Sequence, residues 1–431
     1  MIILPLRNFI VAAALLVSTC AAHAEKLAFQ RVVELAMNNA TSVGIALAGE
    51  KMAQKSYHQA RSAYIPQVYF GSGLAASYGY PMSIGGSGPS IFNVNSQSLL
   101  WNPAQREFIR SARSEWNASS ISTENQRTQA ALEAAIAYIQ LQRNTEKIQA
   151  VHDFASEAAR NETIMRERAA EGLASQADVK KAALVAARAR MRLTEAESAS
   201  RMLRERLAQL TRLSADYIET DGTSIPAFPE LEEQRISVSR AIENSPEVRI
   251  ADEQAKAKAH RAKGEHKQLL PAVDLVGTYG LFSKFNNYDE FFQKFQRNNA
   301  TFGVQIRFGF LNGVEKAEAE AADAEALRAL KQAEAARHQV ANETLRIRSA
   351  VEQLASAREV AQLEYEVAQT DFEAVRERNE AGQGTIIDVQ NARIQAIDRQ
   401  AAAVDTLFEL EKARVQLLSV TGDLRSWAGL R

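Results

Sequence analysis

The chain contains the same pattern twice, and this duplication limits the folds it can adopt more than any other feature. An Ala-rich polar stretch ends at Pro66 and becomes strand-like, and the same change occurs at Pro271, 205 residues later. The later parts repeat at an offset of 210, because the segment at 172–179 returns at 382–389. Self-similarity at so long a period indicates two copies of one structural module.

The first 24 residues are typical of a secretory signal peptide. Arg7 precedes an apolar stretch at 9–17, and Ala24 ends a small-x-small cleavage site. The only cysteine, Cys20, lies in a stretch that loosely resembles a lipoprotein cleavage box, so lipidation and removal with the signal peptide both stay open. The bulky Thr19 favours removal, after which the chain has no cysteine and no disulfide.

Export and duplication together divide the chain into five segments. Each half is expected to combine a helix, two strands and a long helical hairpin. The segments are a signal peptide at 1–24, a first repeat at 25–211, an irregular connector at 212–235, a second repeat at 236–421 and a C-terminal periplasmic tail at 422–431.

Composition argues against several classes of function. The 51 basic and 52 acidic residues balance, and no long basic run suggests nucleic acid. The closest histidines after the signal, His260 and His266, do not share a helix face, and no cysteine joins them as a metal ligand. No glycine-rich phosphate loop follows a strand. We therefore expect neither a cofactor nor a metal. Composition alone does not exclude a hydrolase triad, although nothing points to one.

Four segments alternate between apolar and polar residues. In the clearest, Phe302, Val304 and Ile306 alternate with Gly, Gln and Arg, which predicts a strand with one apolar and one wet face. The strands are expected at about 67–80, 90–101, 272–283 and 300–310. They approach the ~9–11 residues of a tilted membrane strand. Aromatic residues gather at their ends, as in outer-membrane barrels: Tyr78, Tyr80, Trp101, Phe308 and Phe310.

A membrane sheet of four strands cannot close by itself. In lipid, an open edge leaves backbone groups unpaired, each at a cost of several kcal/mol. The smallest usual barrel has about 8 strands, so the barrel must be shared between chains. A soluble sheet packed on helices is the alternative on this pattern alone. The loops at 81–89 and 284–299 are interpreted as extracellular.

The remaining sequence predicts unusually long helices. After Pro103 there is no proline or glycine until Gly172, and the same holds at 314–381, which would give helices roughly 100 Å long. Return helices at 177–211 and 386–421 would be roughly 50 Å long. Apolar residues at spacings of three and four predict a coiled-coil seam: Ala131, Ala134, Tyr138, Leu141, Thr145, Ile148, His152 and Ala155.

Glycines mark the two hairpin tips, near 171–176 and 381–385. Each tip is followed by a Ser/Thr-x-x-Asp sequence, formed by Ser175 with Asp178 and by Thr385 with Asp388. This sequence resembles a capping box at the start of a helix.

With these elements in place, the chain resembles the TolC family of outer-membrane efflux and secretion channels. The residues that carry the resemblance are the tip segments at 171–179 and 381–393 and the junctions at 64–73 and 269–277. It implies a mainly α fold with β strands, in which three chains share a twelve-stranded barrel in the outer membrane of a Gram-negative bacterium. The long hairpins would form a tunnel across the periplasm.

The resemblance also implies a function and partners. The homotrimer would be the exit duct of a tripartite efflux or type I secretion system, without an enzymatic step. It would dock to a periplasmic adaptor (membrane fusion) protein, and an inner-membrane pump or ABC transporter would supply the energy. The hairpin tips implied for adaptor docking contain Gly172, Leu173, Ser175, Gly382, Gly384 and Thr385.

The family narrows its periplasmic entrance with two acidic residues one turn apart. Asp388 matches the first, but the second position is Asn391, which weakens the acidic double ring to a single ring plus amides. Asp178 is the equivalent of Asp388 in the first repeat. Three Asp388 copies at ~8 Å would repel by about 2 kcal/mol per pair at an effective dielectric of ~20. Such repulsion would raise their pKa and favour cation binding; the alternative is that Asp388 only caps its helix.

Two other classes of exported protein fit part of the pattern. A periplasmic adaptor also has a long hairpin, but it would have one hairpin flanked by compact β domains. A coiled-coil scaffold without a pore explains the helices and the signal peptide but not the four alternating strands. The sequence does not indicate the cargo or the partner pump.

Overall fold

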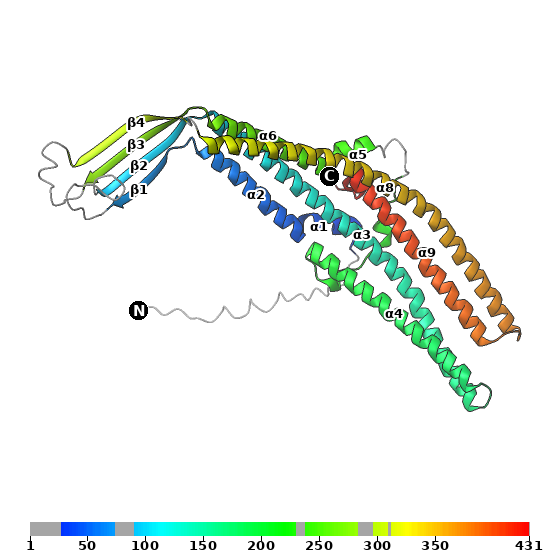
Figure 1. Ribbon diagram of the computed structural model, residues 1–431. Helices are drawn as coiled ribbons and strands as arrows, with labels where there is room; N and C mark the ends of the chain where they lie inside the picture. The colour runs from blue at the N-terminus through cyan, green and yellow to red at the C-terminus, as the bar shows by residue number, and fades with distance from the viewer. Residues whose placement is uncertain (1–26, 74–89, 230–237, 283–295, 309–311, 431) are drawn as a thin grey trace, which may run out of the picture.

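The computed structural model shows an elongated protein with a sheet at one end and helical hairpins that reach the other (Figure 1). It describes residues 27–73, 90–229, 238–282, 296–308 and 312–430. The signal peptide with Cys20, the predicted loop at 81–89 and the aromatic residues Tyr78, Tyr80 and Phe310 lie outside these ranges. Among the described helices, none combines the length and the apolar character needed to cross a membrane.

The two halves contain the same elements in the same order. The first half consists of α1 (Phe29–Asn39), α2 (Thr41–Ser62), β1 (Gln67–Gly73), β2 (Ser90–Trp101), α3 (Pro103–Ala170) and α4 (Gln176–Thr211). The second consists of α5 (Val238–Asn244), α6 (Pro246–Gln268), β3 (Ala272–Phe282), β4 (Asn298–Arg307), α8 (Gly313–Glu380) and α9 (Ile386–Thr421). Two short 3-10 helices, η1 (Ala215–Tyr217) and η2 (Gly222–Ser224), lie between the halves, and α10 (Leu424–Trp427) follows them.

The two hairpins match in the lengths of their helices. Helices α3 and α8 each have 68 residues, and α4 and α9 each have 36. Their first and last residues are all separated by the offset of 210 seen in the sequence. At 1.5 Å per residue, α3 and α8 are each roughly 100 Å long. This exact correspondence allows any position in one hairpin to be compared with its equivalent in the other.

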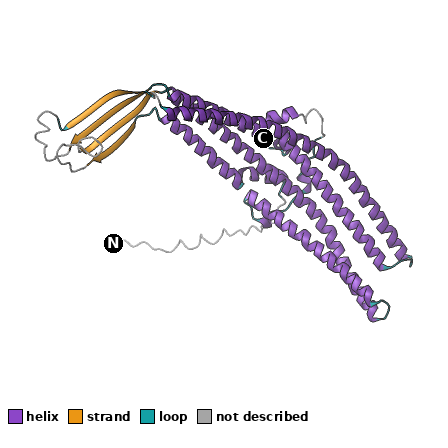
Figure 2. Ribbon diagram, viewed as in Figure 1, coloured by secondary structure: helices purple, strands orange, loops and turns teal. Residues whose placement is uncertain are grey.

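The sheet is antiparallel and joins the two halves. Its strand order is β1-β2-β3-β4, so the last strand of the first half pairs with the first strand of the second (Figure 2). The mainly α fold class with four strands is confirmed. Within this sheet β1 and β4 have one neighbour each, which leaves two open edges.

The sheet has one apolar and one polar face, because paired residues share a face and the face alternates along a strand. The apolar face carries Val68, Phe70, Phe92, Val94, Leu275, Tyr279, Phe302, Val304 and Ile306. The polar face carries Asn93, Asn95, Gln97, Asp274, Thr278, Gln305 and Arg307. The apolar face is open in the single chain, where Phe302 is 83% exposed. A register shift between Leu99 and Trp101 places Trp101 opposite Val273.

The main core lies midway along the body, where both hairpins meet the ends of the chain. Phe29 of α1 packs edge-on against Tyr138 of α3, at 5.4 Å between ring centroids. The Tyr138 hydroxyl donates to the Leu27 carbonyl at 2.6 Å and accepts from the Asp221 amide at 2.7 Å. The described part of the predicted C-terminal tail, 422–430, also joins this core, because Leu424 is buried in it. The C-terminal segment therefore packs into the main core of the helical body.

The predicted coiled-coil seam is correct in its first part and at Ala155, but not at every position between them. Tyr138 and Leu141 are buried as expected, but Thr145 and His152 are exposed. Farther along α3, Ala155 is buried as predicted, and Val151, Phe154 and Ala158, which the predicted seam did not include, are buried with it. This buried cluster also contains Val185 of α4 and Ile397 of α9, so α3 packs against both helices. A heptad pattern assumes one partner helix, so it misses the residues of α3 that face a second one.

Candidate functional site: two hairpin tips at the far end of the helices

Both hairpins turn through the same glycine-dependent loop. Gly172 and Gly382 have φ values of 76° and 77°, in the left-handed region that residues with a Cβ rarely adopt. After each glycine the chain folds back on the last helical turn. The Leu173 amide donates to the Arg168 carbonyl at 2.7 Å, and the Gln383 amide donates to the Arg378 carbonyl at 2.8 Å. Such bonds satisfy carbonyls that the helix end leaves unpaired.

The predicted capping boxes are confirmed at both return helices. In the second hairpin the Asp388 amide donates to Thr385 Oγ1 at 3.2 Å, and the Thr385 amide donates to Asp388 Oδ2 at 3.1 Å. The first hairpin repeats this with Ser175 and Asp178, at 3.2 and 3.4 Å. Each box pairs amides that the start of a helix leaves without partners.

In the single chain, Asp388 acts as a cap. Its side chain accepts a hydrogen bond from the Thr385 hydroxyl at 2.7 Å, and this bond lowers the pKa of the Asp388 carboxyl. Repulsion within a ring of three copies would act in the opposite direction. The ring requires the other two chains, so the cation-binding entrance stays a prediction.

The other predicted site residues lie at the hairpin tips and at the helix-to-strand junctions. Leu173 projects into solvent with 73% of its surface exposed, and Gly384 accepts a hydrogen bond from Asn379 Nδ2 at 3.1 Å. Asn391 is exposed one turn beyond Asp388. Pro66 and Pro271 each stand directly before a strand, β1 and β3. These positions do not test the docking and entrance roles.

Gln390, beside Asn391, is a residue that the sequence did not single out. It is only 4% exposed, and its Nε2 has no hydrogen-bond partner. A buried amide without a partner is uncommon in a folded protein. No local pattern distinguishes Gln390 from the exposed amides around it, which explains why it was missed.

Ion pairs between the two hairpins were also missed. Arg143 of α3 donates to both carboxylate oxygens of Glu411 on α9, at 2.9 and 2.5 Å. The hydrogen bonds from Arg143 to Glu411 raise the pKa of the guanidinium. Three further pairs continue toward the tips: Lys147 with Asp405, Arg192 with Asp398, and Arg393 with Glu157. The partners are more than 200 residues apart, so no short-range sequence signal reveals them.

A separate charged cluster surrounds Glu107 near the sheet. The Glu107 carboxylate is buried, and it accepts from Lys267 Nζ at 2.7 Å and lies 3.0 Å from both His260 Nδ1 and Arg110 Nη1. Burial alone would raise the pKa of Glu107, but the hydrogen bonds from Lys267 and His260 lower it to about 2. Across the described ranges, no three His, Cys, Asp or Glu side chains gather as metal ligands would.

The arrangement of these elements matches known membrane channels. The family model of outer membrane efflux proteins matches residues 237–423. The fold is similar to the outer membrane protein VceC of Vibrio cholerae, with a TM-score of 0.71 and 20% identity over 91% of this chain and 96% of that one. It is also similar to the CmeC outer membrane channel of Campylobacter jejuni, with a TM-score of 0.75 and 16% identity over 92% and 86%.

A third structure shows the same likeness. The open state of the MtrE outer membrane channel of Neisseria gonorrhoeae has a TM-score of 0.71 and 17% identity, over 92% of this chain and 89% of that one. No curated protein sequence gives a significant match. At these identities the structural likenesses show the fold, and residues 237–423 carry the sequence signature of the outer membrane efflux proteins.

Proposed function

We propose that this protein is the outer-membrane exit duct of a tripartite efflux or type I secretion system and that it acts as a homotrimer. The observation that carries the proposal is the sheet. Its apolar face is open, its two edges are unpaired, and it is attached to hairpins roughly 100 Å long. The apolar face is unfavourable in water, and the unpaired backbone groups at the open edges are unfavourable in lipid. Pairing with strands of other chains closes the edges into a barrel, whose apolar face can then contact lipid.

Closure with two further copies would give twelve strands. The apolar face, including Phe302 and Val304, would then contact lipid, and the face with Asn93, Asn95 and Gln305 would line a wet lumen. This is the arrangement of outer-membrane barrels. We therefore propose that the protein resides in the outer membrane of a Gram-negative bacterium, with the hairpins in the periplasm.

The hairpin tips are the proposed docking surface for a periplasmic adaptor. They lie at the end farthest from the sheet (Figure 1). Leu173 exposes an apolar side chain there. The adaptor would connect the duct to an inner-membrane pump or ABC transporter, which supplies the energy. The duct itself then needs no enzymatic chemistry.

Electron microscopy of the membrane-extracted protein in detergent tests the proposal. We expect a particle with three-fold symmetry, a belt of membrane thickness and a hollow stem on the order of 100 Å long. A solid rod or a particle without a belt would overturn the proposal. The scaffold interpretation would then explain the long helices better.

A further inference from the structure

The sheet contains a single pair of charged side chains. Within the described strands β1, β2, β3 and β4, Asp274 of β3 and Arg307 of β4 are the only acidic or basic residues. Both lie on the polar face, because Gln305 pairs with Asp274 and Arg307 stands two residues farther along β4. Arg307 Nη2 lies 2.7 Å from Asp274 Oδ2. A charge in a strand that would lie at membrane depth is a candidate functional residue.

The two charges are presented unequally. Asp274 is only 1% exposed, whereas 57% of the side-chain surface of Arg307 is exposed. Their contact has the distance of an ion pair but not the geometry of a hydrogen bond, and Arg307 donates no hydrogen bond to any residue that the structure describes. The pair therefore turns its positive end to solvent, with the negative charge behind it and the guanidinium N–H donors unused.

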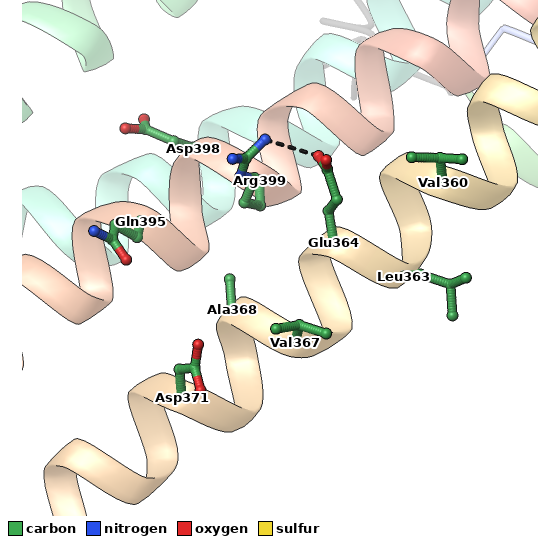
Figure 3. Close-up of a pocket in the computed structure, with 9 residues that line it drawn as sticks. All are labelled: Val360, Leu363, Glu364, Val367, Ala368, Asp371, Gln395, Asp398 and Arg399. Atoms are coloured by element: carbon green, nitrogen blue, oxygen red, sulfur yellow. Dashed lines mark hydrogen bonds and ion pairs between the residues drawn. The ribbon is translucent and has the colours of Figure 1, made fainter.

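Other arginines of this chain use their donors internally. Arg399 of α9 donates to Glu364 of α8 at 2.7 Å, across a groove between the two helices (Figure 3). Arg143 donates to both carboxylate oxygens of Glu411. Arg307 differs from both, because its counter-ion holds it by charge and leaves its donors for a partner outside the chain.

Arg307 lies at the end of the sheet where the strands meet the helices. It pairs with Ala272, the first residue of β3, which directly follows Pro271 at the helix-to-strand junction. In the trimer of the proposed function, the polar face of the sheet lines the lumen. Three copies of Arg307 would therefore form a ring at the periplasmic mouth of the barrel. Rings of arginine or lysine favour anions in pores.

The barrel would be narrow enough for such a ring to act on whatever passes. Strands spaced by ~4.8 Å and tilted by ~40° give a twelve-stranded barrel a backbone radius of roughly 12 Å. Side chains narrow the lumen further, and the Debye length is ~10 Å in 0.1 M salt. Every ion that crosses the mouth would thus pass within about one Debye length of a guanidinium.

We propose that Arg307 from three chains forms an anion-binding ring at the periplasmic mouth of the barrel, and that the ring takes oxyanionic groups, such as carboxylates, phosphates and sulfates, as they leave the tunnel. The proposal rests on the trimeric duct of the proposed function and names the chemistry that its barrel favours. The planar guanidinium suits this ligand class, because it can bind two oxygens of one group at once. Asp274 is the positioning residue that holds the guanidinium at the wall.

Ion selectivity of the full-length trimer in planar bilayers tests the ring. The central variant is D274N/R307Q, which removes both charges and, like the wild type, keeps the pair neutral. Reversal potentials in a KCl gradient near ~0.1 M give the ratio of anion to cation permeability. We expect this ratio to be about twofold higher in the wild type, because the guanidinium stands nearer to a passing ion than the carboxylate behind it. All variants keep the same periplasmic entrance, so a difference between them arises at the ring.

Further variants fix the sign and the specificity of the effect. R307K keeps the charge and should keep the wild-type ratio, although it loses the planar fork, so inorganic pyrophosphate should block its current less than that of the wild type. D274N leaves the guanidinium unopposed and should raise the ratio above that of the wild type. R31Q removes one exposed positive charge from α1, far from the sheet, and should leave the ratio unchanged.

The outcomes separate the ring from the duct. If a conducting three-fold particle has the same ratio in the wild type and in D274N/R307Q, the pair only joins β3 to β4 and the inference fails, although the duct stands. If R31Q lowers the ratio as much as D274N/R307Q does, the net charge of the protein is the cause and the inference also fails. If the wild type forms neither a trimer nor a channel, the proposed function itself fails. Should D274N/R307Q not assemble, D274N decides, because an unchanged ratio would show that the guanidinium does not face the lumen.

Discussion

In each hairpin, two residues cap the start of the return helix, and the sequence alone predicts this role. Ser175 with Asp178 and Thr385 with Asp388 form capping boxes because the bonds span only three residues. Gln390 behaves differently, since its burial depends on how whole helices pack. Local hydrogen bonding can thus be predicted from sequence, whereas the partnerless amide of Gln390 cannot.

Removing the Thr385 cap should loosen the start of α9. We expect Thr385→Ala to cost about 1 kcal/mol, because the amide of Asp388 loses its acceptor. Hydrogen exchange should become faster at residues 386–389 and stay unchanged beyond Leu410. Ser175→Ala should have the same effect on α4, and equal protection in variant and wild type would show that the box does not stabilise the helix.

Glu107 should make the protein sensitive to acid. Its pKa is lowered to about 2 from an ordinary 4.5, so the stability it adds is complete above about pH 4.5 and is lost as the pH falls toward 2. The shift corresponds to roughly 3 kcal/mol. Thermal melting from pH 5 to 2 should therefore fall more steeply for the wild type than for Glu107→Gln. The exposed control Glu359→Gln should follow the wild type; parallel curves for all three proteins would contradict the assignment.

The long helices are the elements that the sequence predicts best. Runs without glycine or proline set their lengths, and the tip glycines set their ends, so the hairpins follow from local rules. The predicted seam was wrong at Thr145 and His152, which are exposed, and it missed Phe154 and Ala158, which are buried in a cluster with α4 and α9. Periodicity describes one helix face, whereas the number of neighbours is a property of the folded chain.

The loop at the tip of the second hairpin should depend on Gly382 more than on Gly384. Gly382 has a positive φ, so Gly382→Ala should cost about 1 kcal/mol from backbone strain alone, since no atom lies within 4 Å of the new Cβ. Gly384→Ala is the matched control, because its Cβ would meet Asn379 only at an ordinary 3.8 Å. Hydrogen exchange at 378–388 should rise in the first variant only. Equal exchange in both would show that the left-handed turn is not required.

The whole molecule joins two duplicated halves through contacts that the sequence does not show. Duplication, strand number and helix length are visible in the sequence, and from them the fold class followed. The pairing of β2 with β3 and the ion pairs between hairpins needed the structure, because each joins residues far apart in the chain. Toward the tips, these pairs become exposed and the buried cluster becomes small, so the hairpins are held together weakly where the duct would open.

Breaking the outer ion pairs should therefore open the tips. The combined variant Asp398→Ala and Asp405→Ala removes the partners of Arg192 and Lys147. Two exposed pairs are together worth about 1 kcal/mol, which corresponds to a roughly fivefold rise in open probability. Conductance in planar bilayers measures this rise. The difference from wild type should shrink in 1 M salt, where screening acts within about 3 Å.

Glu133→Ala provides the control for that experiment. It breaks an ion pair with Arg206, at 3.1 Å, in which the carboxylate is about as exposed as Asp398, but this pair joins α3 to α4 within one hairpin. Its loss should leave conductance unchanged, because the two hairpins keep every contact between them. If both variants raised conductance equally, general loss of surface charge would be the cause. If neither did, the hairpins would be held together by the apolar cluster around Phe154 and Ile397 rather than by charge.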